Sequence, residues 1–96
     1  MMMKPPLSYP RVMAVKPLPE KRLLVTFSTG ETKVYDCKPL LEEDVFGPLQ
    51  DEALFQCARA DRHGYGVIWN DEIDLSESEL WLNGNPTEPA VGANAG

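Results

Sequence analysis

His63 is the only histidine in the sequence, and an acid–base dyad or a metal site would make use of it. Asp61 and Asp71 lie near it along the chain and could orient an imidazole. Its neighbours Arg62 and Gly64, however, form a sequence typical of an exposed turn. The sequence therefore favours an exposed turn histidine over a catalytic one.

Cys37 and Cys57 are the only cysteines, and their spacing is neither that of a CxxC pair nor that of a disulfide framework. We favour two reduced, half-buried thiols in a cytoplasmic protein, while a disulfide between them stays open. A thiol nucleophile would need Cys37 to lie beside His63, and nothing in the spacing supports that arrangement.

Several carboxylates occur between residues 71 and 79, where they could be taken for a calcium or magnesium site. The spacing of an EF-hand and its turn glycine are absent. Glu77 and Glu79 fit better at the N-terminus of a helix, where negative charge is favourable. The sequence also contains no phosphate-binding glycine loop, nucleophile elbow or zinc spacing, so we expect no metal, no cofactor and no enzymatic activity.

Large aromatic residues are spread along the chain and admit two interpretations. They would most simply fill the core and its rim. An exposed subset would instead form a surface for a partner, because aromatic residues are enriched at protein interfaces. The residues that we take as a possible interaction surface are Tyr35, Phe46, Trp69 and Trp81.

Length and charge narrow the classes of function. With 96 residues the chain makes one domain, and its hydrophobic fraction of 43% is ordinary for a globular protein. The formal net charge of −6 repels a phosphate backbone, so we expect no nucleic-acid binding by this chain alone. No apolar run is long enough for a signal peptide or a membrane span, so we expect a cytoplasmic protein without membrane contact.

The elements that would position these residues begin with a β-hairpin predicted for residues 23–36 (LLVTFSTGETKVYD). Apolar and polar residues alternate in its first half, and Gly30 provides the freedom that a tight reversal needs. A strand over residues 11–18 precedes it, and Pro17 predicts that the end of that strand lies at a sheet edge or leaves the sheet. These three strands would form a meander.

Two registers of this hairpin compete. A two-residue loop would set Val25 opposite Val34 but would force Thr29, a β-branched residue, to a positive φ. A three-residue loop avoids this by placing only Gly30 in the left-handed region, and it sets Val25 opposite Lys33. We favour the three-residue loop slightly, because the steric objection to the other is local.

The second half of the chain predicts short helices and a second hairpin. A helix should begin at Ser76, since Ser76 and Glu79 have the spacing of a capping box, and Asn83 to Pro86 should end it. The other expected elements are helical turns over residues 40–43 and 49–55 and a hairpin of residues 56–61 with 65–69.

The fold class that follows is α+β: a small, mostly antiparallel sheet of about five strands with two or three short helices. Residues 11–86 would form the single domain. Residues 1–10 would be a flexible N-terminal arm and residues 87–96 a disordered tail.

An ordered set of short motifs resembles the bacterial domain of unknown function DUF2442. The set spans about residues 11–81 and departs from the family where Asn70-Asp71-Glu72 lacks the family's proline and glycine. The matching segments are a strand at Val12–Val15, VTFSTGETKVYD (25–36), Pro39-Leu40-Leu41, FGPLQDEALF (46–55), WNDEIDL (69–75) and Leu80-Trp81.

The resemblance implies a small α+β domain and little chemistry. Some relatives append a helix-turn-helix DNA-binding domain, and genes of this type often lie beside another small gene, as toxin–antitoxin pairs do. The function we expect is a non-catalytic protein-interaction or regulatory module, working as a homodimer or with a small protein partner. The alternatives are a regulatory domain that works with a DNA-binding domain absent from this chain, and a small-molecule or metal-binding domain.

Overall fold

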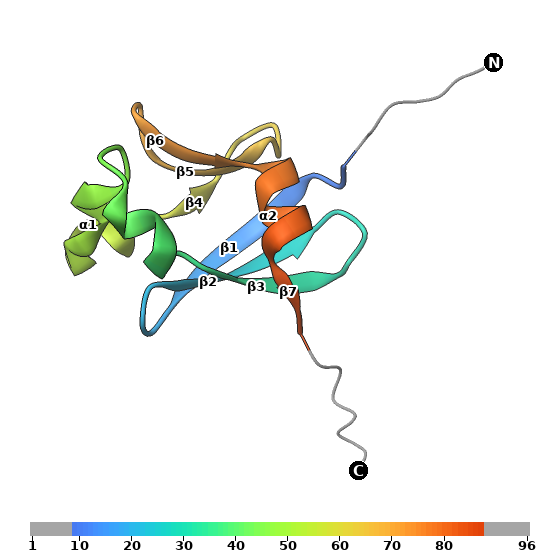
Figure 1. Cartoon of the computed structure of the whole chain (residues 1–96). Coiled ribbons are helices and arrows are strands. Elements are labelled where there is room, and N and C mark those ends of the chain that lie inside the picture. The colour runs from blue at the N-terminus through green and yellow to red at the C-terminus, as the bar shows by residue number, and fades with distance from the viewer. Residues whose placement is uncertain (1–8, 88–96) are drawn as a thin grey trace, which may run out of the picture.

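The predicted hairpin is present in the computed structural model, which describes residues 9–87 (Figure 1). It consists of β2 (Arg22–Phe27) and β3 (Thr32–Asp36). Leu23 lies opposite Tyr35 and Val25 opposite Lys33, which confirms the three-residue loop. Gly30 takes a φ of 93°, the left-handed conformation that the turn requires.

The hairpin belongs to a four-stranded antiparallel sheet in the order β1-β2-β3-β7. β1 (Val12–Leu18) is an edge strand, as Pro17 predicts. β7 (Asn85–Pro86) was not expected, because its sequence indicates only the end of a helix. Thr87, predicted to belong to the disordered tail, donates its backbone N–H to the carbonyl of Thr32 at 3.2 Å.

A second antiparallel sheet has the order β4-β5-β6, so the prediction of a single sheet of about five strands is corrected to two sheets. The predicted second hairpin is formed by β4 (Arg59–Ala60) and β5 (Gly66–Asn70). β6 (Ile73–Ser76) occupies a segment whose acidic residues indicate a polar connection. Burial nevertheless alternates along it with the two-residue period of a strand.

The helical segments are short, as predicted. Ser76 is the N-cap of α2 (Glu77–Asn83), and its Oγ accepts a hydrogen bond from the backbone N–H of Glu79 at 3.1 Å. The others are two 3₁₀ helices, η1 (Lys38–Glu42) and η2 (Gly47–Gln50), and α1 (Glu52–Phe55). Each 3₁₀ helix has a proline in its first turn, where the missing N–H costs nothing.

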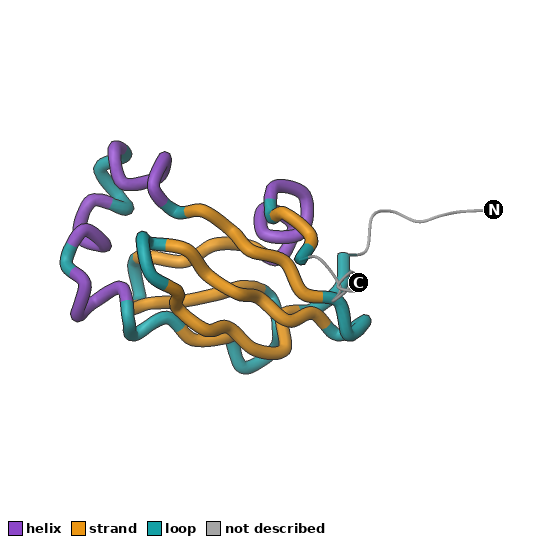
Figure 2. Tube along the Cα trace, turned by 90° about the horizontal axis from the view of Figure 1, so that it is seen from below, coloured by secondary structure: helices purple, strands orange, loops and turns teal. Residues whose placement is uncertain are grey.

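The core lies between the inner faces of the two sheets. α2 closes one side of it, and η1, η2 and α1 gather at one end, as the view from below shows (Figure 2). The fold is therefore α+β, as predicted. The buried apolar residues are Val12, Leu23, Val25, Phe27, Tyr35, Cys37, Leu49, Phe55, Val67, Trp69, Ile73, Leu75 and Leu80.

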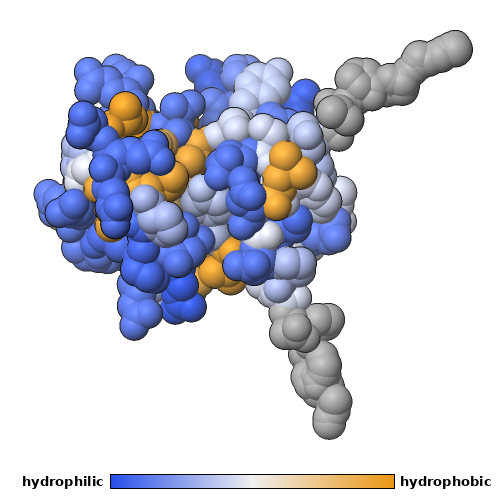
Figure 3. Space-filling model, in the orientation of Figure 1, coloured by the Kyte–Doolittle hydropathy of each residue, from blue (hydrophilic) through white to orange (hydrophobic). Residues whose placement is uncertain are grey.

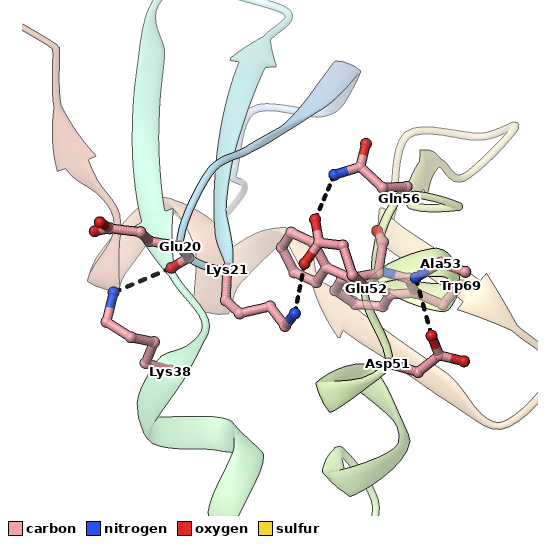
Figure 4. Close-up of polar contacts among 9 residues, drawn as sticks. Glu20, Lys21, Lys38, Asp51, Glu52, Ala53, Gln56 and Trp69 are labelled. Atoms are coloured by element: carbon pink, nitrogen blue, oxygen red, sulfur yellow. Dashed lines mark hydrogen bonds and ion pairs between the residues drawn. The ribbon is translucent and has the colours of Figure 1, made fainter.

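Phe55 joins the helical end to both sheets, and Figure 4 shows the side chains of Lys21, Glu52 and Trp69 at this junction. The indole N–H of Trp69 in β5 donates to the carbonyl oxygen of Phe55 at 3.1 Å, and the two rings lie 6.1 Å apart. The ammonium group of Lys21, from the turn between β1 and β2, lies 5.4 Å from the centroid of the Phe55 ring and forms an ion pair with Glu52. The buried hydrogen bond between the indole of Trp69 and the carbonyl of Phe55 therefore fixes α1 against the second sheet.

The predicted arm of residues 1–10 and tail of residues 87–96 fall almost entirely outside the described residues. Only Tyr9, Pro10 and Thr87 of those two segments are described, and all three are partly buried.

Gly30→Val should destabilise the fold, because a β-branched residue would have to adopt the left-handed turn conformation. No atom lies within 4 Å of a Cβ built at this position, so the cost is conformational rather than steric crowding. We expect a loss of about 1–3 kcal/mol in the free energy of unfolding, measured by urea denaturation.

Gly30→Asn is the matched control, because asparagine tolerates the left-handed region, and it should lose much less stability. Equal midpoints for the wild type and the valine variant would contradict the assigned turn.

Candidate interaction surface

The four aromatic residues predicted to form an interaction surface do not lie on one surface. Tyr35 and Trp69 are buried in the core, with 5% and 3% of their surface exposed. They face the opposite sheet, because Tyr35 lies opposite the buried Leu23 of β2 and Trp69 lies two positions from the buried Val67 of β5. Phe46 and Trp81 are half-buried and pack on the edge of the core. The expected surface is thus corrected for Tyr35 and Trp69.

Trp81 and Tyr35 also make specific contacts within the fold. Trp81 meets Phe27 edge-on with ring centroids 5.0 Å apart, and the ammonium of Lys33 lies 3.8 Å from the centroid of its ring. The hydroxyl of Tyr35 donates to Glu79 at 2.7 Å. Burial, followed by this contact with Glu79, raises the pKa of Tyr35 far above its usual value. These side chains stabilise the fold and are not free for chemistry.

His63 lies exposed in the turn between β4 and β5, as predicted. The carboxylate of Asp61 lies beside it but accepts hydrogen bonds from the backbone N–H groups of His63 and Tyr65, at 2.8 and 3.2 Å. These two backbone bonds hold the pKa of Asp61 below its ordinary value. The carboxylate of Asp61 therefore orders the turn. It accepts its hydrogen bonds from the backbone and not from the imidazole of His63, so it does not orient that ring as a general base.

The two thiols are free and lie in different environments. Cys37 is fully buried, and burial raises the pKa of its thiol to about 12. Cys57 is exposed at the end of α1. The prediction of unpaired thiols is confirmed, whereas neither is half-buried as expected.

The carboxylates between residues 71 and 79 are not gathered around one point. Within residues 9–87, no group of three or more His, Cys, Asp or Glu side chains could hold a metal ion. Glu79 is engaged by Tyr35, and Asp74 faces outward from β6. No described helix is long and apolar enough to cross a membrane.

The fold does bring together two arginines and the histidine, a group that the sequence did not indicate. Arg11 precedes β1, while Arg62 and His63 lie in the turn between β4 and β5, and together they line an open groove of about 280 Å³. Met13 lines the same groove, and the ring of Tyr65 lies beside it under the guanidinium of Arg11. We call these five residues the basic groove.

Backbone and side-chain bonds hold the two walls of the basic groove together. The N–H of Val12 donates to the carbonyl of Gly64 at 2.8 Å, and a guanidinium nitrogen of Arg11 donates to the carbonyl of His63 at 2.8 Å. Gly64 has a φ of 82°, and a Cβ there would lie 2.7 Å from the Cβ of Arg11. Only glycine allows the turn to approach Arg11 so closely.

A second exposed feature is the outer face of the four-stranded sheet. Leu24 of β2 lies between Lys16 of β1 and Val34 of β3, and Val34 lies beside Asn85 of β7. Leu18 shares this face. All three apolar residues are half-buried, and none of them is packed against the core. We call Leu18, Leu24 and Val34 the outer apolar strip.

The other exposed apolar residues are scattered. The face in Figure 3 is mostly hydrophilic, with separate apolar spots over the helical end and over α2. The large hydrophobic residues with the greatest exposure are Met13 at 63%, Val45 at 57%, Tyr65 at 55% and Leu82 at 62%. Two of these four, Met13 and Tyr65, belong to the basic groove.

Comparison with known proteins gives a family and one structural relative. Residues 12–86 match the family described as "Protein of unknown function (DUF2442)". The fold is similar to the crystal structure of "Putative DNA Binding Protein NE0471 from Nitrosomonas europaea ATCC 19718", with a TM-score of 0.70 and 26% sequence identity. The match covers 83% of this chain and 52% of that one, so this chain spans about half of its length. No curated protein matches the sequence.

The two thiols should react at very different rates. In the native protein a disulfide reagent should modify about one thiol quickly, that of Cys57, because a buried thiol with a raised pKa provides almost no thiolate. Full denaturation should expose the second. Cys57→Ser should make the native protein unreactive, and rapid modification of that variant would contradict the burial of Cys37.

Proposed function

Since the chain belongs to the DUF2442 family, proteins of unknown function, we propose from the structure that it is a non-catalytic protein-interaction module. The observation that carries this proposal is the outer apolar strip. Leu24 and Val34 form an apolar centre, and Lys16, Thr26, Thr32 and Asn85 surround it. An apolar centre with a polar rim is the usual composition of a protein interface.

The partner that we propose first is a second copy of this chain. A two-fold axis lets the same strip meet itself, and two-fold dimers are the commonest assembly. Two sheets can pack face to face through such apolar residues. The net charge of −6 opposes pairing, but salt screens exposed charges beyond about 8 Å at physiological ionic strength.

The sheet face is a better candidate for pairing than the two edges of the four-stranded sheet. Pro17 removes a hydrogen-bond donor from edge strand β1, whose neighbour in space is β4. On the other side, β7 is only two residues long and contains Pro86.

The free thiols support a reducing compartment, the cytoplasm, as the place where the protein pairs.

Sedimentation equilibrium over a range of concentrations should detect species heavier than the 10.7 kDa monomer, tending to a dimer. Leu24→Asp should weaken this association at least about tenfold, because a carboxylate would be buried at the centre of the interface. Leu82→Asp adds the same charge at an exposed position of α2, outside the outer apolar strip, and should leave the association constant unchanged.

Far-ultraviolet circular dichroism would verify that both variants remain folded. A single species of monomer mass at all concentrations, or equal weakening by both substitutions, would overturn the homodimer.

A second candidate is a regulatory domain that works with a DNA-binding domain outside this chain. It is favoured by the relative described as a putative DNA-binding protein, of which the match covers 52%. The part of that protein beyond the match has no counterpart here, so a DNA-binding activity could belong to it. In this case the present fold would provide pairing or partner recognition, and the other domain would contact DNA.

The isolated chain should then fail to shift duplex DNA in a gel at micromolar concentration and physiological salt. The net charge of −6 repels the phosphate backbone, and the basic groove contains only two arginines. A retarded band that disappears as salt is raised would show that this chain binds DNA itself.

A further inference from the structure

The basic groove concentrates positive charge on an acidic protein. Arg11 and His63 are 52 positions apart in the sequence and are joined by a hydrogen bond between the guanidinium and the carbonyl. Within residues 9–87, neither Arg11 nor Arg62 forms an ion pair with a carboxylate. The only acidic residue that lines the groove is Asp61, one of whose oxygens is bonded to two backbone N–H groups, and its single negative charge leaves the two arginines in excess. The guanidinium of Arg62 is therefore available to an external anion.

The groove also offers apolar surface beside this charge. Met13 is 63% exposed and Tyr65 is 55% exposed, which is unusual for residues that pack well in cores. The guanidinium of Arg11 lies 4.7 Å from the centroid of the Tyr65 ring, and this cation–π contact holds both side chains in place. Tyrosine, methionine and arginine are the residue types enriched at the centre of protein interfaces.

We infer that the basic groove binds a short acidic peptide segment of another protein, with carboxylates on Arg62 and Arg11 and an apolar side chain between Met13 and Tyr65. The charge complementarity is direct, because arginine binds carboxylates through parallel N–H groups. The walls are already ordered by the bonds between Val12 and Gly64 and between Arg11 and His63. An ordered site loses less entropy when the peptide binds.

Several features favour a peptide over a nucleic acid. The groove encloses about 280 Å³, room for a few side chains, and provides two arginines where an extended phosphate backbone needs a longer row of cations. The surrounding protein carries a net charge of −6, which repels a long polyanion more strongly than a short peptide. The inference concerns a different surface from the outer apolar strip, so it stands apart from the proposed homodimer.

The experiment titrates the whole chain, labelled with nitrogen-15, with the peptide acetyl-Asp-Glu-Phe-Asp-Glu-amide at low salt. Saturable shifts should appear at the backbone amides of Arg11, His63, Gly64 and Tyr65. The uncharged peptide acetyl-Asn-Gln-Phe-Asn-Gln-amide should bind at least about tenfold more weakly. A higher salt concentration should lower the affinity for the acidic peptide.

Arg62→Glu should reduce the affinity for the acidic peptide at least about tenfold, because it reverses the exposed charge at the groove. Lys38→Glu makes the same charge change at an exposed lysine of η1, outside both proposed surfaces, and should alter the affinity less than about twofold. Tyr65→Ser should weaken binding while leaving the salt dependence unchanged. None of these exposed substitutions removes a core residue, and the unperturbed amides of the spectrum would confirm the fold.

Three results would overturn the inference. They are equal binding of the charged and uncharged peptides, equal losses for Arg62→Glu and Lys38→Glu, and shifts away from the groove. Inorganic phosphate and a short DNA duplex are titrated in parallel. If either binds the groove as tightly as the acidic peptide, the site is a general anion site and the peptide assignment fails.

Sedimentation of Arg62→Glu should match the wild type, which keeps the test of the peptide site distinct from the test of the homodimer.

Discussion

The hydrogen bond from the indole of Trp69 to the carbonyl of Phe55 is the contact on which the arrangement of this fold depends. It is the link between α1 and the second sheet, and it lies where water is excluded. Breaking this bond would leave the buried indole N–H of Trp69 without an acceptor, and an unsatisfied buried donor costs about 1–3 kcal/mol. Lys21 approaches the same phenylalanine ring from the turn of the first sheet. One residue thus receives contacts from both sheets, so the helical end and the sheet sandwich cannot shift independently.

Local features of the fold could be predicted from the sequence because local sterics determine them. The register of the β2–β3 hairpin follows from the cost of a positive φ at Thr29, which leaves Gly30 as the left-handed residue. The start of α2 follows from the capping hydrogen bond between Ser76 and Glu79. β6 was missed because its acidic residues indicate a polar connection, and β7 because two residues show no period; pairing with β5 and β3 creates both strands. The separation into two sheets is a result of such pairings.

The candidate surfaces were less predictable from the sequence, because contacts between distant segments, rather than local sterics, determine them. Tyr35 and Trp69 look like surface candidates in the sequence, since nothing local decides which face of a strand is covered. The basic groove depends on Arg11 meeting the turn at Arg62 and His63, a contact between distant segments. Gly64 was a usable signal, because a glycine beside charged turn residues marks a possible close approach. The partner of that approach could come only from the tertiary structure.

The junction between β6 and α2 has a consequence for how sequences of this kind can vary in length. Ser76 is at once the last residue of the strand and the N-cap of the helix, so no connecting loop exists there. One inserted residue would turn α2 by about 100° relative to the strand and carry Leu80 out of the core. Changes of length are therefore incompatible with this junction, and insertions should be confined to the exposed turns. A gap-free stretch at this point in aligned relatives would be the mark of that constraint.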